Sequence, residues 1–186
     1  MKTTLQEFDE VIGICRELFV KKMHDYSTAW RILRPSSVTD QISIKAQRIR
    51  RIEETGENKV GESIIYEFIG IVNYAVMAQI QLSQPACDIK NYKMDAQEVI
   101  RLYDQYTQNA KTLLTDKNHD YGEAWRNMRI SSITDIILMK LLRIKQIEDN
   151  HADCWVSEGL DANYYDIFNY AVFALIKLNV IQQKNK

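Results

Sequence analysis

Two lysines stand on helix faces that are otherwise apolar, and they are the first residues in this sequence whose placement suggests chemistry. Lys45 follows Ile42 by three residues and precedes Ile49 by four, and Lys140 precedes Ile144 in the same way. This spacing puts each ammonium group on a face that helix geometry assigns to the core. Because a buried ammonium group without a partner is costly, we expect both lysines to point inward and to meet a carboxylate or a bound anion.

Other polar residues accompany these lysines on the same predicted helices. The candidate ligand-binding residues there are Lys45, Arg48, Asn73, Lys140, Arg143 and Asn169. Glu62 and Glu158 precede the two asparagines by eleven residues, and we expect them to be the carboxylates that the lysines contact. A structural network of ion pairs and a charged pocket for a ligand both explain this set, and the sequence leaves both open.

A second group of basic residues lies in the segment WRILRPSS, which recurs as WRNMRISS. Arg126 and Arg129, like Arg31 and Arg34, are one helical turn apart and directly precede a residue pair Ser-Ser that we expect to cap a helix. The free N–H groups of a helix start favour an anion, so Arg126 and Arg129 are candidate phosphate-binding residues. The alternative is an ordinary capped helix with solvated arginines.

The triplet HDY also occurs twice, and its second copy, His119, Asp120 and Tyr121, is a candidate ligand-binding segment. The alternative is that Asp25 and Asp120 cap the short helices that follow them. A metal phosphohydrolase of the HD type needs further histidines at metal-binding spacing, and the third histidine, His151, does not supply them. The three cysteines lack the spacing of a zinc site.

These paired motifs result from an internal duplication. With a shift of 95 residues, 18 of the 32 residues from Lys22 to Glu53 are identical to those from Lys117 to Glu148. After a one-residue insertion the shift becomes 96, which aligns Asn73 with Asn169. The sequence therefore predicts a first helical repeat over residues 1–86, a linker over 87–94 and a second repeat over 95–186. Two similar halves are expected to pack as one globular unit with pseudo-two-fold symmetry and adjacent third helices.

The predicted fold class is all-α. Only 6 Gly and 2 Pro occur, so regular structure must run in long pieces. Each half has a first helix that breaks near the HDY triplet, a short helical turn, a second helix ending near Glu53 or Glu148, and a third helix that is apolar almost all round. The third helices are expected over residues 64–82 and 164–180. The fold is thus an internally duplicated helical bundle with three main helices and a short one per half.

Composition limits the partners. A formal net charge of −1 gives no broad basic surface for duplex nucleic acid or for an anionic membrane. No uninterrupted apolar run is long enough to cross a membrane. Three cysteines and no recognisable signal peptide favour a cytoplasmic location. The remaining partners are a small molecule and a second copy of the chain as a homodimer.

Four separated pieces of the sequence together resemble a known family. HDYGEAW, Lys140 with Arg143, Glu158 and the segment DIFNYAV from Asp166 occur in the order found in the nucleotide modification associated domain family, a set of small helical bacterial and phage proteins. The resemblance covers both halves. It implies a role near nucleotide metabolism or base modification, without a settled reaction.

The same carboxylates are similar, more distantly, to those of MazG-like all-α nucleoside triphosphate pyrophosphohydrolases. That resemblance implies a Mg²⁺ ion held by Glu158 and Asp166, with Glu62 as the first-half ligand, and phosphate bound by Lys140 and Arg143. Gly70 occupies the position of Asp166 in the first half, so we expect any working metal site in the second half.

Three hypotheses follow. The protein binds a phosphorylated nucleoside and hydrolyses it, or binds it without catalysis, or is a helical interaction scaffold whose shared polar residues lock the two halves together. The hydrolysis hypothesis is the one that requires Mg²⁺. The scaffold hypothesis is the one that predicts no ligand beside Lys140.

Overall fold

The computed structural model describes residues 2–150 and 159–180, which form six α-helices, two short 3₁₀ helices and no strand. In chain order they are α1 (Thr4–Tyr26), η1 (Ala29–Ile32), α2 (Pro35–Thr55), α3 (Ile64–Ser83), α4 (Ala96–Tyr121), η2 (Ala124–Asn127), α5 (Ile130–Asp149) and α6 (Leu160–Lys177). The all-α prediction is confirmed. The order of elements in the first half, α1 to α3, is repeated by α4 to α6 in the second.

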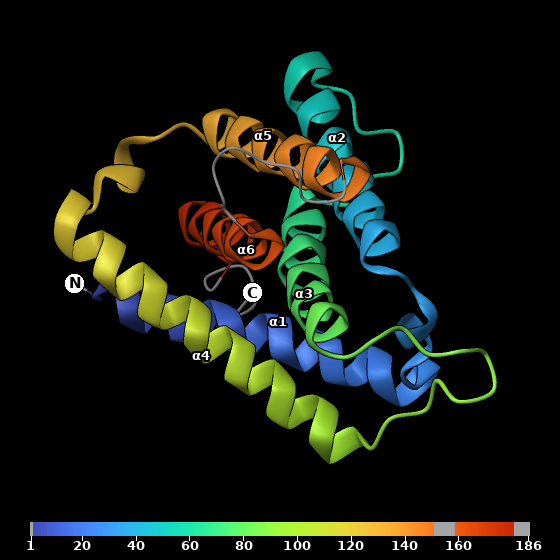
Figure 1. Ribbon diagram of the computed structural model, residues 1–186. Helices are drawn as coiled ribbons and strands as arrows, with labels where there is room; N and C mark the ends of the chain where they lie inside the picture. Colours follow the sequence, from blue (N-terminus) through green and yellow to red (C-terminus); the bar gives the residue numbers. More distant parts are fainter. Residues whose placement is uncertain (1, 151–158, 181–186) are drawn as a thin grey trace.

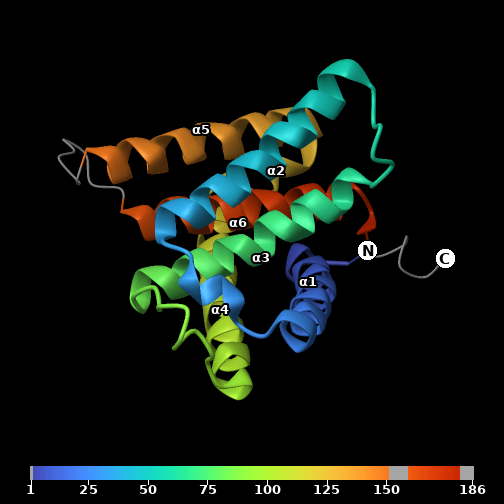
Figure 2. The same cartoon turned by 90° about the vertical axis from the view of Figure 1, so that its right-hand side faces the viewer.

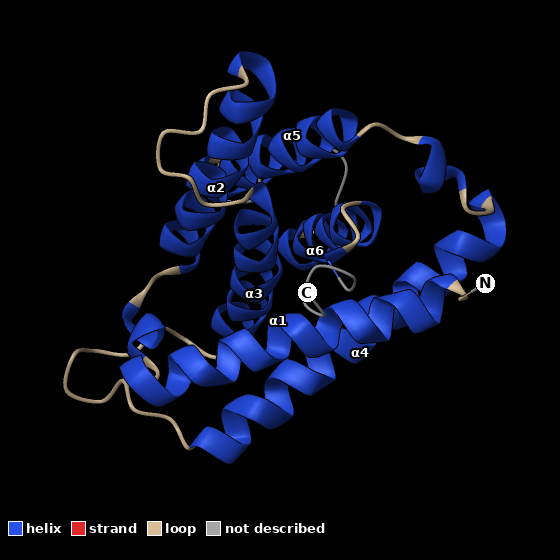
Figure 3. Cartoon of the chain, turned by 180° about the vertical axis from the view of Figure 1, so that it is seen from behind, coloured by secondary structure: helices blue, strands red, loops and turns tan. Residues whose placement is uncertain are grey.

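The helices form three layers, with α3 and α6 side by side in the middle (Figure 1). Helices α2 and α5 cover one side of this pair, and α1 and α4 cross the other (Figure 2). The view from behind shows the same central position of α3 (Figure 3). By length and hydropathy alone α3 could cross a membrane, but 72% of its most apolar stretch is buried inside the protein. Burial of these two apolar helices is the main hydrophobic contribution to the fold.

Two predicted helix starts are wrong in detail. The N-cap positions of α2 and α5 are Arg34 and Arg129, neither of which caps through its side chain, and the Ser-Ser pairs lie inside the first turn. In α2, Pro35 takes the first helical position, where its missing N–H leaves no hydrogen bond unmade. The helix therefore begins before Ser36, and the expected serine caps are absent from both described helix starts.

Three further boundaries differ from the prediction. Helices α1 and α4 continue through the HDY triplets to Tyr26 and Tyr121 instead of breaking there. The aspartates do not cap the short helices, since Asp25 and Asp120 each lie 3.1 Å from the Nδ1 atom of the preceding histidine. Helix α6 runs from residue 160 to 177 rather than from 164 to 180.

The two halves contact one another through reciprocal pairs of interactions. Between α1 and α4, Arg16 binds Asp104 at 2.7 Å, and at the equivalent positions Lys111 binds Asp9 at 2.7 Å. Each contact is thus made twice with the roles of the halves exchanged. Such reciprocity is what a two-fold interface between identical subunits shows, here within one chain.

The same reciprocity holds between α2 and α5. The Thr39 hydroxyl donates to Glu148 at 2.9 Å, and the Thr134 hydroxyl donates to Glu53 at 3.0 Å. Burial is the largest influence on both carboxyl groups and raises the pKa of Glu53 and of Glu148, against the lowering effect of the threonine hydrogen bonds. Burial therefore makes ionisation of both glutamates costly to the folded state.

Asn73 and Asn169 occupy equivalent positions in the two halves and connect the central helices to the layer of α1 and α4 by hydrogen bonds. Asn73 donates to the Cys15 carbonyl at 3.1 Å and accepts from the Tyr103 hydroxyl at 2.8 Å. Asn169 donates to the equivalent carbonyl of Ala110 at 3.1 Å, but its Oδ1 is buried and has no partner among the described atoms. The reason is one substitution between the halves, because Phe8 occupies the position equivalent to Tyr103.

We predict opposite effects for two substitutions at these equivalent positions. Tyr103→Phe should lower the free energy of unfolding by about 1–2 kcal/mol because it leaves the Asn73 acceptor buried and unpaired. Phe8→Tyr should raise it, by about 1 kcal/mol, because the new hydroxyl reaches Asn169. Urea denaturation of both variants and the parent measures this. A loss of stability in both would show that the two positions are not equivalent.

The α2/α5 contact predicts a pH dependence. A carboxyl group whose pKa is raised in the folded state loses stabilisation as pH rises above its ordinary value of 4.5. Replacing it with an amide of the same shape removes this loss. Glu53→Gln and Glu148→Gln should therefore gain melting temperature relative to the parent at pH 7 and gain less at pH 4. An equal difference at both pH values would contradict the burial of these carboxylates.

Candidate functional site

A cavity of about 360 Å³ lies in the second half, where the carboxyl end of α4 and the short helix η2 face α6. Figure 1 shows α4, whose carboxyl end is drawn in yellow, and α6 in red. We call it the second-half pocket. Its lining consists of Leu114, Lys117, Asn118, Tyr121, Gly122, Ala124, Trp125, Met128, Asp166, Asn169, Tyr170 and Phe173.

The charged part of this pocket is one carboxylate held between two lysines. Asp166 contacts the Nζ atom of Lys117 at 2.5 Å and that of Lys140 at 2.9 Å. Lys140 comes from α5, so three helices meet at this carboxylate. The side chains of Asp166 and Lys140 are each only 18% exposed, whereas that of Lys117 is 57% exposed. Lys117 is thus the ammonium group most open to a ligand.

The opposite part of the pocket is aromatic. The Trp125 ring stacks on Phe173, with ring centres 4.2 Å apart and planes 5° from parallel, and Tyr170 meets Phe173 edge-on at 6.1 Å. The Arg126 guanidinium lies over the Trp125 ring at 4.5 Å. Tyr121 is well exposed at the rim. Such a wall of fixed aromatic rings is suited to a flat, apolar ligand face.

One polar atom of this wall has no partner. The indole Nε1 of Trp125 is buried, and no acceptor lies within hydrogen-bond distance among the described residues. Trp125 itself is 5% exposed. A buried donor without an acceptor is uncommon in folded proteins, and burial of this N–H costs the folded state free energy.

The first half has a cavity of about 350 Å³ at the equivalent place, between α1 and α3. Six lining positions correspond, and at three of them the residues are the same type: Lys22 and Lys117, Asn73 and Asn169, and Tyr74 and Tyr170. The remaining positions differ in chemistry. Gly70 replaces the carboxylate, and Met77 replaces the aromatic ring of Phe173.

The carboxylate of the first half stands one turn away, at Glu67. It accepts from Lys45 at 3.1 Å and from Arg48 at 2.7 Å, and its side chain is 10% exposed. Gly70 makes this possible, because a Cβ atom there would lie 2.7 Å from the Lys45 side chain. The Lys45 stem passes over the glycine to reach Glu67. In the second half the acid is Asp166, which occupies the position equivalent to Gly70.

The structure corrects the predicted partners of the lysines. Lys45 and Lys140 are largely buried, as expected, but Lys45 binds Glu67 rather than Glu62. Helical spacing explains the error, since Glu62 precedes the first turn of α3 and is exposed. Glu158 lies outside the described residues, so its predicted contact is not described. Asp166 is the acid that Lys140 meets.

The predicted arginine site does not form as a phosphate cradle. Arg126 binds Glu7 and Glu123, both at 2.5 Å, and so ties η2 to α1. Its first-half equivalent, Arg31, is buried and donates to the carbonyl of Pro85 at 2.8 Å. Arg129 is exposed at the start of α5. Arg31 and Arg126 therefore hold parts of the protein together instead of forming the predicted anion site.

The other predicted residues divide between the pocket and its surroundings. Tyr121 and Asn169 line the second-half pocket, whereas His119 and Asp120 are exposed beside it. Arg143 is half-buried on α5, one turn after Lys140. The prediction missed Lys117, Trp125 and Glu67. The signal for Lys117 was present, because the duplication aligns it with Lys22.

The described part of the chain contains no cluster of ligands for a divalent metal. No group of three or more His, Cys, Asp or Glu side chains converges there. Asp166, the predicted ligand, is instead neutralised by two ammonium groups. The two ammonium groups compete with a cation for the Asp166 oxygens, and Glu158, the other predicted ligand, lies outside the described residues.

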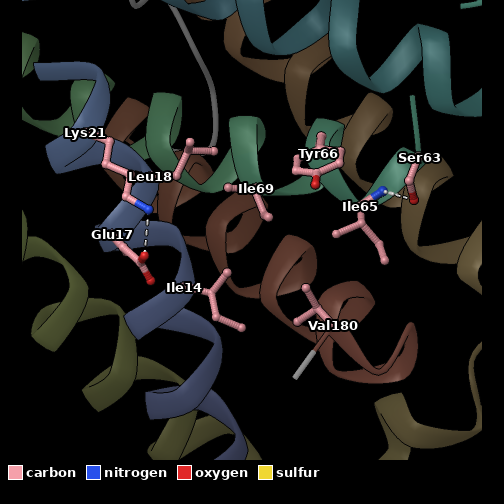
Figure 4. Close-up of a pocket in the computed structure, with 9 residues that line it drawn as sticks. All are labelled: Ile14, Glu17, Leu18, Lys21, Ser63, Ile65, Tyr66, Ile69 and Val180. Carbon is pink, nitrogen blue, oxygen red and sulfur yellow. Dashed lines mark hydrogen bonds and ion pairs between the residues drawn. The ribbon is translucent and has the colours of Figure 1, made fainter. Parts of the chain in front are cut away.

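Another cavity, of about 340 Å³, lies between α1 and the start of α3 (Figure 4). Its lining is mostly aliphatic, with Ile14, Ile65, Ile69 and Val180 around it. Its charged residues already bind one another, since Lys21 donates to Glu17 at 2.8 Å. This cavity contains none of the predicted site residues.

Comparison with known families identifies the fold unit that builds the pockets. The nucleotide modification associated domain 1 family matches the chain twice, over residues 22–82 and 117–178, which together are more than half of it. The chain belongs to this family. Each match begins at the lysine that lines its pocket, Lys22 or Lys117, and ends within one residue of the carboxyl end of the third helix of its half. The tandem arrangement of two nucleotide modification associated domains agrees with the duplication. No curated protein and no solved structure matches the chain.

The ion pairs of Asp166 and Glu67 predict which acidic residues contribute to the stability of the folded state. Asp166→Asn should lower the free energy of unfolding by about 2 kcal/mol, because it removes the carboxylate that pairs with the partly buried Lys140. Glu67→Gln should do the same in the first half. The matched control is Glu62→Gln, which should change stability by less than about 0.5 kcal/mol because Glu62 is exposed. Chemical denaturation compares the three, and a large effect of the Glu62 change would reverse the assignment.

Proposed function

We propose that the protein binds a phosphorylated nucleoside in the second-half pocket. The observation that carries this proposal is the pairing, in one cavity, of a fixed aromatic wall with an accessible lysine. The base packs against the wall near Tyr170 and Phe173, and the phosphate lies near Lys117. Family membership supports this choice of ligand, because the family is described by its association with nucleotide modification.

The first-half pocket is less suited to a base. Met77 replaces Phe173, so the stack with the tryptophan of the short helix is lost, and Trp30 is not among the residues lining that cavity. Aromatic pairs add about 0.5–1.5 kcal/mol beyond their buried area, which is enough to bias a ligand toward one of two otherwise similar sites. We therefore assign the nucleotide to the second half.

Metal-assisted hydrolysis of a nucleoside triphosphate is the catalytic form of this proposal. It needs Mg²⁺ bound by Asp166 with Glu158, and Asp166 would first have to give up a lysine contact. The non-catalytic form needs only the residues already in place. The ion pairs around Asp166 favour binding without hydrolysis. Addition of Mg²⁺ distinguishes the two forms of the proposal, because only the catalytic form then converts the nucleotide to products.

The proposal predicts nucleotide binding that depends on Phe173. A panel of nucleoside mono-, di- and triphosphates should contain at least one that raises the melting temperature and binds in calorimetry. Phe173→Met, which installs the residue of the first half, should weaken that binding by about three- to tenfold through loss of the aromatic stack. The same titration with Mg²⁺, followed by chromatography of the nucleotide, tests for hydrolysis.

Met77→Leu in the first-half pocket is the control for this variant, and it should leave the affinity unchanged. No binding by any nucleotide would contradict the proposal and favour the interaction scaffold. Equal losses for the two variants would show that the ligand is not confined to the second half.

A further inference from the structure

Helix α4 contributes an amide without a partner to the second-half pocket. Leu114, Lys117, Asn118 and Tyr121 line the cavity from this helix, and their spacing of three or four residues puts them on one face of it. The Asn118 side chain is half-buried. Its carboxamide makes no hydrogen bond within the described part of the chain. Both its oxygen and its N–H groups are therefore available to a ligand.

The other amide and the carboxylate of the lining already have partners. Asp166 binds Lys117 at 2.5 Å and Lys140 at 2.9 Å. Asn169 donates to the Ala110 carbonyl at 3.1 Å, and its oxygen is buried. Among the residues that line this pocket, Asn118 is thus the amide that can still form hydrogen bonds with a molecule in the cavity.

The amide at this position occurs in the second half alone. The duplication aligns Asn118 with Met23, which packs against the hydrophobic core and is not among the residues lining the first-half pocket. A methionine thus fills the same place in the first half, so helix packing does not require the amide. The half that has the aromatic stack of Trp125 on Phe173 is also the half that has Asn118 in its pocket.

We infer that Asn118 contacts the edge of the base and determines which nucleoside the second-half pocket accepts. This inference rests on the proposed function and specifies its ligand. The base packs its flat face against the wall near Tyr170 and Phe173 on α6 and turns its polar edge toward α4. The phosphate lies near Lys117, whose ammonium group is at Asp166 on α6.

The chemistry of a carboxamide suits this function. It has an oxygen acceptor beside two N–H donors, and the edges of the nucleobases present donors and acceptors in an order that differs from base to base. A base whose order matches makes two hydrogen bonds with Asn118. A base whose order does not match leaves a polar group without a partner, which weakens its binding.

The test compares dissociation constants for nucleotides that share sugar and phosphates but differ in the base, with the intact chain. Purines are compared with purines and pyrimidines with pyrimidines, because stacking on the wall depends on ring size. Within the class that binds more tightly, the parent should favour one base by at least about fivefold, the lower end of the discrimination given by a bidentate amide contact. Asn118→Met, which installs the residue of the first half, should reduce this ratio to within about twofold.

Asn118→Ala should reduce the ratio equally, and it separates loss of the amide from the bulk of the methionine. Thr115→Met is the matched control, because Thr115 is exposed on the same helix outside the pocket. It should leave the ratio unchanged, and melting temperatures show that each variant folds.

Three results would overturn the inference while leaving nucleotide binding intact. They are a parent preference below fivefold, a preference that survives in a folded Asn118 variant, and an equal loss of affinity for both bases. The last of these would place Asn118 at the sugar or the phosphate. A complete lack of nucleotide binding by the parent would instead overturn the proposed function.

Discussion

The packing of α3 against α6 is the constraint on which the rest of the structure depends. Both helices are apolar almost all round, so neither can be covered by its own half alone, and each lies beside the other between two further layers. The other two pairs of equivalent helices, α1 with α4 and α2 with α5, then meet across the same pseudo-two-fold axis. The reciprocal contacts of Arg16 with Asp104 and of Lys111 with Asp9 follow from it. The two pockets lie at equivalent places of the halves.

Duplication also explains how the two pockets came to differ without a change of fold. A lysine on the second helix of each half must find an acid on the third, and helix geometry offers two positions one turn apart. The first half uses Glu67 and keeps Gly70 small so that Lys45 can pass. The second uses Asp166, which brings Lys117 into the cluster. Only the second half combines this cluster with the aromatic stack of Trp125 on Phe173.

Much of the fold could be predicted from the sequence because it depends on features repeated twice. The alignment of the halves, the apolar third helices and the scarcity of Gly and Pro specify an all-α bundle. Contacts between helices were harder to predict. Spacing places Lys45 on a buried face, but it cannot choose between Glu62, which precedes α3, and Glu67, which lies in the first turn of that helix. The Ser-Ser pairs resemble helix caps in composition, but Pro35 takes the first helical position of α2 and the serines follow it inside the first turn. Trp125 was overlooked since its role depends on Phe173, 48 residues later in the chain.

The central claim is that the nucleotide binds in the second-half pocket, and the indole signal of Trp125 reports on this directly. A two-dimensional ¹H–¹⁵N spectrum of the intact protein, titrated with a nucleotide that binds in calorimetry, resolves Trp125 from the other two tryptophans after assignment by substitution. The account predicts a saturable shift of the Trp125 signal, because the nucleotide packs against the aromatic wall to which this ring belongs, with the Trp30 signal unmoved. A nucleotide that binds without moving the Trp125 signal would contradict it.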